Sequence, residues 1–158
     1  MIDLPALAER IHGILVRANI GFTPSQDGLE FFVPIRDGTA AVMIRPGEFG
    51  EEPLVVFQSP VLQGVPFEEA GARALAAVNL RNCGLVIGRL AYYEADGVIA
   101  LEYAILASNL QAQELIRALQ IVAAYADTLD DDLLLELGVG QRARDVWGAP
   151  QPGDAGAA

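Results

Sequence analysis

The stretch Val78–Ser108, VNLRNCGLVIGRLAYYEADGVIALEYAILAS, decides the fold that the sequence predicts. Its first residues read as the end of a helix. Leu85–Tyr93 and Val98–Ala107 are apolar runs rich in branched and aromatic residues, which is typical of strands. Asp96-Gly97 between them is a tight-turn signal, so the stretch predicts an antiparallel hairpin. Because both strands are apolar at nearly every position, we expect both of their faces to be covered.

The residues before this stretch predict one helix and three strands. Apolar side chains recur at helical spacing over Leu4–Ala18, which indicates a helix with one buried stripe. Asp37-Gly38 is a second turn signal. The segment Arg45–Pro53 holds two prolines and three glutamates, and we expect an exposed, mobile loop there. Three runs of branched and aromatic residues around these turns predict strands: Leu29–Pro34, Ala40–Ile44 and Leu54–Leu62.

A second helix is predicted over Phe67–Asn82, because two glutamates lie in its first turn, where the helix dipole favours negative charge. A third helix opens with a predicted capping box of Ser108 and Gln111, and Gly138 ends it. The apolar stripe of this last helix is long and regular: Leu115, Leu119, Val122, Ala126, Leu129, Leu133 and Leu137.

These elements predict an α+β fold in which helices pack on one antiparallel sheet, in the order α-β-β-β-α-β-β-α. A chain of 158 residues is the size of one domain. We therefore expect a single domain over residues 1–140. Residues 141–158 are rich in glycine, alanine and proline towards their end, and we expect them to form a flexible tail.

The charge excludes some classes of partner. The chain has 21 acidic and 10 basic residues, a net charge of -11, and all its basic residues except one histidine are arginines. Binding to nucleic acid needs clustered cations, and acidic charge repels membranes, so neither partner is expected. The N-terminus lacks the pattern of a secretory signal, and no apolar stretch is long enough to span a membrane. We expect a cytoplasmic protein.

No catalytic, metal-binding or cofactor-binding motif is apparent, so we expect no enzyme activity, metal or cofactor. The only histidine, His12, lies off the apolar stripe of the first helix, and we expect it at the surface. Cys83 follows a helix C-terminus and is expected to be a buried structural thiol. Phosphate-binding glycine motifs are absent. The acidic run at the end of the last helix lacks the spacing of a calcium loop, and we expect it to be solvated surface: Asp127, Asp130, Asp131, Asp132 and Glu136.

Asn79 and Asn82 form an unusual pair, three residues apart at the end of the second helix. Asparagine tolerates the left-handed conformation and can satisfy backbone groups, so a structural role is the favoured interpretation. The alternative is that the pair positions the following hairpin at a subunit contact. The nearby arginines Arg73, Arg81 and Arg89 are expected to pair with surface acids.

The run Asn79-Leu-Arg-Asn82, followed by a strand, Asp96-Gly97, a second strand and a long amphipathic helix, resembles the YbjN family. That family is similar in fold to the type III secretion chaperones, and the order of elements over Leu4–Leu137 matches theirs. The resemblance implies a small acidic homodimer that binds segments of other proteins without using ATP. Some members of the family are described as sensory or regulatory.

The favoured hypothesis is therefore a non-enzymatic, homodimeric, chaperone-like adaptor. Its predicted dimer interface is on the second helix and the hairpin: Ala74, Leu75, Val78, Asn79, Asn82, Leu85 and Ile87. Its predicted client surface offers pockets or an edge to an extended segment: Phe31, Val42, Ile44 and Val56. One alternative is a small-ligand sensor, with a pocket between the sheet and the last helix. The other is an enzyme whose site is assembled from scattered acids, arginines and tyrosines.

Overall fold

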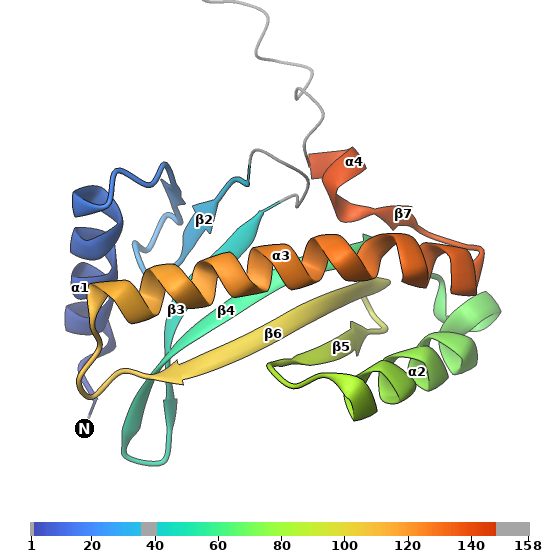
Figure 1. Cartoon of the computed structure of the whole chain (residues 1–158), viewed down its shortest axis with the longest axis horizontal. Helices are drawn as coiled ribbons and strands as arrows, with labels where there is room; N and C mark the ends of the chain where they lie inside the picture. Colours follow the sequence, from blue (N-terminus) through green and yellow to red (C-terminus); the bar gives the residue numbers. More distant parts are fainter. Residues whose placement is uncertain (1, 36–40, 148–158) are drawn as a thin grey trace, which may run out of the picture.

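The computed structural model describes residues 2–35 and 41–147. They form helices packed on an antiparallel sheet, and the predicted order of helices and strands is confirmed (Figure 1). Three short elements, β1, β7 and α4, were not predicted. The elements in chain order are α1 (Leu4–Arg17), β1 (Thr23–Pro24), β2 (Phe31–Val33), β3 (Val42–Phe49), β4 (Glu52–Gln63), α2 (Phe67–Gly84), β5 (Arg89–Tyr93), β6 (Val98–Leu106), α3 (Ala112–Leu137), β7 (Gln141–Arg142) and α4 (Ala143–Trp147).

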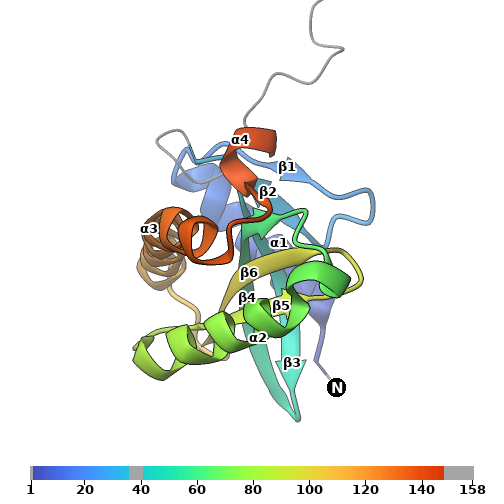
Figure 2. The same ribbon diagram turned by 90° about the vertical axis from the view of Figure 1, so that its right-hand side faces the viewer.

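The strands lie in the order β1-β2-β3-β4-β6-β5, and β7 pairs with the end of β4. In the central strand β4, Val55, Phe57 and Ser59 are buried, whereas the alternate residues Val56 and Gln58 are half-buried. This alternation follows from the two-residue period of a strand. The buried face is the one that α3 crosses, and α2 packs against β5 and α3 at one end of the sheet (Figure 2).

The helix α3 has 26 residues, and the whole predicted apolar stripe on it is buried. Its predicted start is wrong. The capping box is formed by Gln111 and Glu114, and the Ser108 hydroxyl instead donates to a Glu52 carboxylate oxygen at 2.8 Å. The helix therefore begins three residues later than the sequence signal indicated. Gly138 ends it as predicted, in the left-handed conformation with a φ of 66°.

The predicted loop Arg45–Pro53 is wrong, because β3 and β4 form one continuous hairpin whose turn is Gly50-Glu51. Pro46 lies beyond the last residue of β3 that pairs with β2, so β3 is an edge strand at this residue, where proline is tolerated. In the β5–β6 hairpin, the first strand is shorter than the predicted Leu85–Tyr93, since β5 begins only at Arg89.

The expectation that both faces of the second hairpin are covered is wrong for the end of β6, where Ala104 and Leu106 are exposed. At the C-terminus, β7 and α4 fold against the sheet and α3 beyond the predicted domain boundary at residue 140. The predicted turn at Asp37-Gly38 and the tail residues 148–158 lie outside the described residues.

Candidate functional site: an apolar groove beside α3

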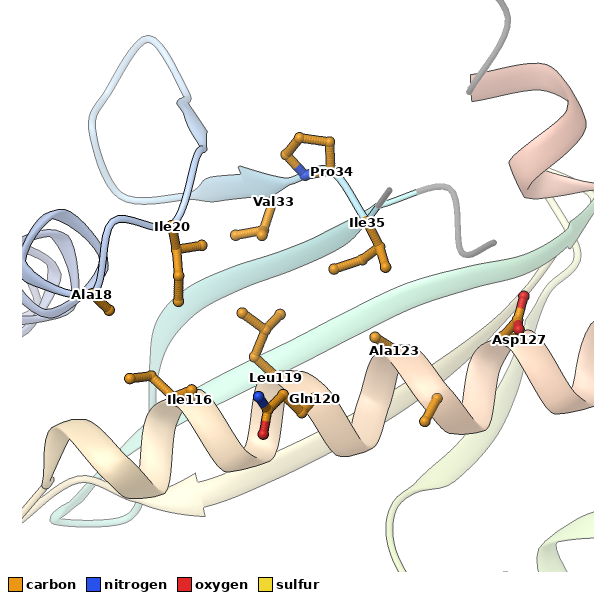
Figure 3. A pocket seen from close by; sticks show the side chains of 11 residues that line it. Ala18, Ile20, Val33, Pro34, Ile35, Ile116, Leu119, Gln120, Ala123 and Asp127 are labelled. Carbon is orange, nitrogen blue, oxygen red and sulfur yellow. The ribbon is translucent and has the colours of Figure 1, made fainter. Parts of the chain in front are cut away.

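A groove of about 570 Å³ lies between the C-terminal end of α1, the end of β2 and one side of α3 (Figure 3). The side chains from the chain around α1 and β2 face those of α3 across it. Most of its lining residues are apolar, and the full set is Ala18, Ile20, Val33, Pro34, Ile35, Ile116, Leu119, Gln120, Ala123, Ala124 and Asp127.

Helical periodicity builds one wall of this groove. On α3, Ile116, Gln120, Ala124 and Asp127 recur at spacings of three and four residues, so they form a row beside the buried stripe. The opposite wall follows from the end of α1, where Asn19 has a φ of 53° and turns the chain back. The deepest residues are buried, and the isoleucines at the rim are half-buried and open to solvent.

Asp127 is the one charged residue among those that line the groove, and Figure 3 places it at one end. Its Oδ1 accepts a hydrogen bond from Arg144 Nη1 at 2.9 Å. Arg144 Nε also lies 3.3 Å from Asp130 Oδ2, and Arg142 Nη2 lies 2.5 Å from Asp131 Oδ1. We call these two arginines and three aspartates the clasp, because they fasten the segment of β7 and α4 to α3.

The prediction that the acidic run is solvated surface holds for Asp131, Asp132 and Glu136, which are exposed, but it is wrong for Asp130. Asp130 is only 3 % exposed, and no hydrogen-bond partner is found for its Oδ1 within the described residues. Burial raises the pKa of this carboxyl, and the attraction of Arg144 only partly offsets that effect. The sequence missed this contact because the basic partner lies in a helix that the sequence pattern did not predict.

We expect Asp130→Asn to raise the melting temperature at pH 7. Because the pKa of Asp130 is higher in the folded state than in the unfolded state, the folded chain loses stability as pH rises from the unfolded pKa of about 3.9 through the raised folded pKa. The neutral amide avoids that loss, while Arg144 keeps Asp127 and Asp131 as partners. Thermal unfolding followed at pH 3 and pH 7 measures the effect. A lower melting temperature of the variant at pH 7 would mean that the Arg144 pair outweighs burial.

The predicted dimer residues divide into three groups. Ala74 and Val78 are buried in the core of the chain itself, so they are not available to a second subunit in this structure. Asn82 is hydrogen-bonded through its side-chain amide to the backbone of Leu90. The remaining four reach the surface to differing extents, with Leu75 and Asn79 exposed and with Leu85 and Ile87 half-buried.

The predicted client residues lie on opposite faces of the sheet. Phe31, Val42 and Ile44 point towards the helices and are fully buried, because strand alternation directs them into the core. Val56 points to the other face and is half-buried. The groove is therefore a different surface from the one that the sequence indicated.

The structure also tests the predictions for His12, Cys83, Arg81 and Arg89. His12 is exposed as predicted, and its ring packs edge-on against Phe22 with 5.3 Å between the ring centroids. Cys83 was predicted to be buried, but it is exposed, because it lies on the outward side of the last turn of α2. Arg81 and Arg89 form the predicted pairs with acids, at 2.8 Å from Glu136 and Glu102 respectively.

The described residues hold no group of three or more His, Cys, Asp or Glu side chains arranged to bind a metal ion. Within the same residues, none of the helices is both long enough and apolar enough to cross a membrane.

Comparisons with known proteins identify the family. The chain is similar in fold to the crystal structure of YbjN from E. coli, with a TM-score of 0.55 and 9 % sequence identity, over 79 % of this chain and 91 % of that one. Among proteins with curated descriptions, none matches this sequence. Residues 6–146 match the family model TY-Chap1, described as "T3SS (YopN, CesT) and YbjN peptide-binding chaperone 1". The chain therefore belongs to the TY-Chap1 family of peptide-binding chaperones.

Proposed function

We propose that this protein is a non-enzymatic adaptor that binds an extended, apolar segment of a partner protein in the groove beside α3. The observation that carries the proposal is the groove itself, a solvent-open channel of about 570 Å³ in a chain of a peptide-binding family. Half-buried isoleucines at its rim offer apolar surface that a partner would remove from water.

The dimensions of the groove suit a short extended peptide. From Ile116 to Ala124, α3 rises about 12 Å, at about 1.5 Å per residue. An extended chain rises about 3.3 Å per residue and turns alternate side chains to the same side. A peptide of about five residues therefore matches this length, with about three of its side chains directed into the groove.

The probe for this proposal is a fluorescein-labelled peptide Leu-Thr-Leu-Thr-Leu, compared with an all-threonine peptide of the same length. We expect Ile116→Asn to weaken binding of the leucine peptide about tenfold. Full burial of one isoleucine contributes roughly 1.5–3 kcal/mol, and a peptide would bury only the part of Ile116 that is still exposed. Fluorescence anisotropy measures both dissociation constants.

The matched control is Leu135→Asn, which also lies on α3 but is 86 % exposed and outside the groove. It should bind the leucine peptide as the parent chain does. Equal affinities for the two peptides, or equal losses in the two variants, would contradict binding in the groove.

We also propose that the chain forms a homodimer through the outward side of α2. Leu75 is 50 % exposed and Leu80 is 66 % exposed on this helix, although both are large and apolar. Exposed side chains of this kind are typical of protein contact surfaces. Around the helix, the small residues Ala72 and Ala76 lie between these two leucines, and they would permit close approach of a second helix.

Leu75→Glu is expected to convert the dimer into a monomer at micromolar concentration, since it places an unpaired charge in the contact. Its side chain lies outside the core, so the melting temperature of the monomer should change little. Sedimentation velocity measures the mass. Phe49→Glu is the control, because Phe49 is 80 % exposed on the β3–β4 hairpin and not on α2. A parent chain that sediments as a monomer would contradict the proposal.

A further inference from the structure

At its charged end the groove contains an ion pair, Asp127 with Arg144, which plays no part in the binding of apolar side chains. Asp127 ends the row of α3 residues that line the groove, and Arg144 already donates to it from α4. A guanidinium group of the chain itself thus lies where the apolar channel meets its one acidic residue. A segment that is bound along the apolar residues would place its next inward-pointing side chain at this same position, beside Asp127.

Negative charge exceeds positive charge around this point. Arg142 and Arg144 together contact four carboxylates, so two negative charges remain without a cation of their own. Asp130, one of the four, is nine-tenths or more buried and has an oxygen that lacks a hydrogen-bond partner among the described residues. The local field therefore favours an additional cation.

We propose that the groove selects segments in which a basic residue, arginine or lysine, flanks the apolar part, and that Arg144 occupies this basic position in the free protein. The inference rests on the proposed function of the groove and adds the chemistry of the segment. A basic side chain of the partner shares Asp127 with Arg144 or takes its place. Arg144 is thus a built-in competitor that lowers the affinity for segments without a cation.

The spacing along α3 fixes where the basic residue should lie. From Ile116 to Asp127 the helix rises about 16 Å, which corresponds to about five steps of an extended chain. The sixth residue of the segment therefore lies level with Asp127, but its side chain points away from the groove. The basic side chain belongs at the seventh residue, which points to the same side as the apolar side chains and can reach back to Asp127. A peptide can run along the groove in either direction, so one probe carries the basic residue at its C-terminal end and another carries it at its N-terminal end.

The test compares two pairs of labelled peptides, Leu-Thr-Leu-Thr-Leu-Thr-Arg with its glutamine counterpart, and Arg-Thr-Leu-Thr-Leu-Thr-Leu with its glutamine counterpart. In one pair the arginine peptide should bind about threefold to tenfold more tightly, as expected for a charge-assisted contact at a half-exposed carboxylate. The preference should shrink at high salt. Fluorescence anisotropy gives the ratio of dissociation constants.

Asp127→Asn should bring this ratio to about one, whereas Arg144→Gln should increase it, because the competing guanidinium is gone. Asp132→Asn removes the same charge from an exposed position on α3 and should leave the ratio unchanged. Circular dichroism confirms that each variant is folded. A variant that binds both peptides more weakly by the same factor leaves the ratio of their dissociation constants unchanged, so this ratio reports only the preference for arginine.

Equal binding of arginine and glutamine peptides, or a preference that survives Asp127→Asn, overturns the inference. A preference that falls in Arg144→Gln overturns the competitor role. If the glutamine peptides bind and Ile116→Asn weakens them, the proposed function stands while the basic preference fails. If no peptide binds, both fail.

Discussion

Gly88→Ala is expected to lower the free energy of unfolding by about 3 kcal/mol or more. Gly88 has a φ of 75°, a left-handed conformation that costs a residue with a Cβ roughly 1–2 kcal/mol. A Cβ at this position would also lie 2.5 Å from the backbone oxygen of Glu102. That oxygen belongs to β6, which is held between β4 and β5, so it cannot move without breaking ladder bonds.

The matched control is Gly28→Ala. Gly28 has nearly the same φ, 72°, but no heavy atom lies within 4 Å of the Cβ that would be added. This variant should therefore show only the conformational cost, about 1–2 kcal/mol. Urea unfolding measures both values. Equal losses in the two variants would mean that the backbone of β6 accommodates the methyl group.

Asn82→Ala is expected to destabilise the fold by about 2–3 kcal/mol, the cost of leaving two partly buried backbone groups without a partner. The Leu90 N–H donates to Asn82 Oδ1 at 2.7 Å, and Asn82 Nδ2 donates to the Leu90 carbonyl at 3.0 Å. The amide thus binds the outer edge of β5 as a neighbouring strand would. It also joins the end of α2 to the first residues of β5.

Asn79→Ala is the control, because Asn79 lies one turn earlier on α2 and is exposed. It should change the free energy of unfolding by less than about 0.5 kcal/mol. Asn82→Asp tests the geometry, since the carboxylate keeps the acceptor but loses the donor to the Leu90 carbonyl. Urea unfolding that gives equal values for Asn82→Ala and Asn79→Ala would contradict the role assigned to Asn82.

The order of elements could be predicted because apolar periodicity on α1 and α3 and the turn at Asp96-Gly97 are local signals. Boundaries failed where long-range contacts compete with local ones. Composition predicts a loop around Pro46, but pairing with β4 keeps this residue in a strand. Ser108 carries a capping signal, yet its hydroxyl is engaged by Glu52, more than fifty positions away.

The candidate site could not be predicted, because a strand pattern does not reveal which face the chain itself covers. Phe31 and Ile44 are apolar enough for a client surface, and α1 and α3 use that same apolarity for the core. The groove arises only where the ends of α1 and β2 meet α3. One local sign was present, the row from Ile116 to Asp127 beside the leucine stripe. The ion pair of Asp127 at the end of this row could not be predicted, because its partner Arg144 lies in α4, which the sequence pattern did not indicate.

The bidentate contact of Asn82 also has a consequence for how copies of this protein behave at high concentration. β5 is the last strand at its side of the sheet, and a bare outer strand is a template on which another molecule can add its own. With both Leu90 backbone groups already occupied, that template is interrupted near its start. We therefore expect Asn82 to hinder edge-to-edge polymerisation of this protein through β5.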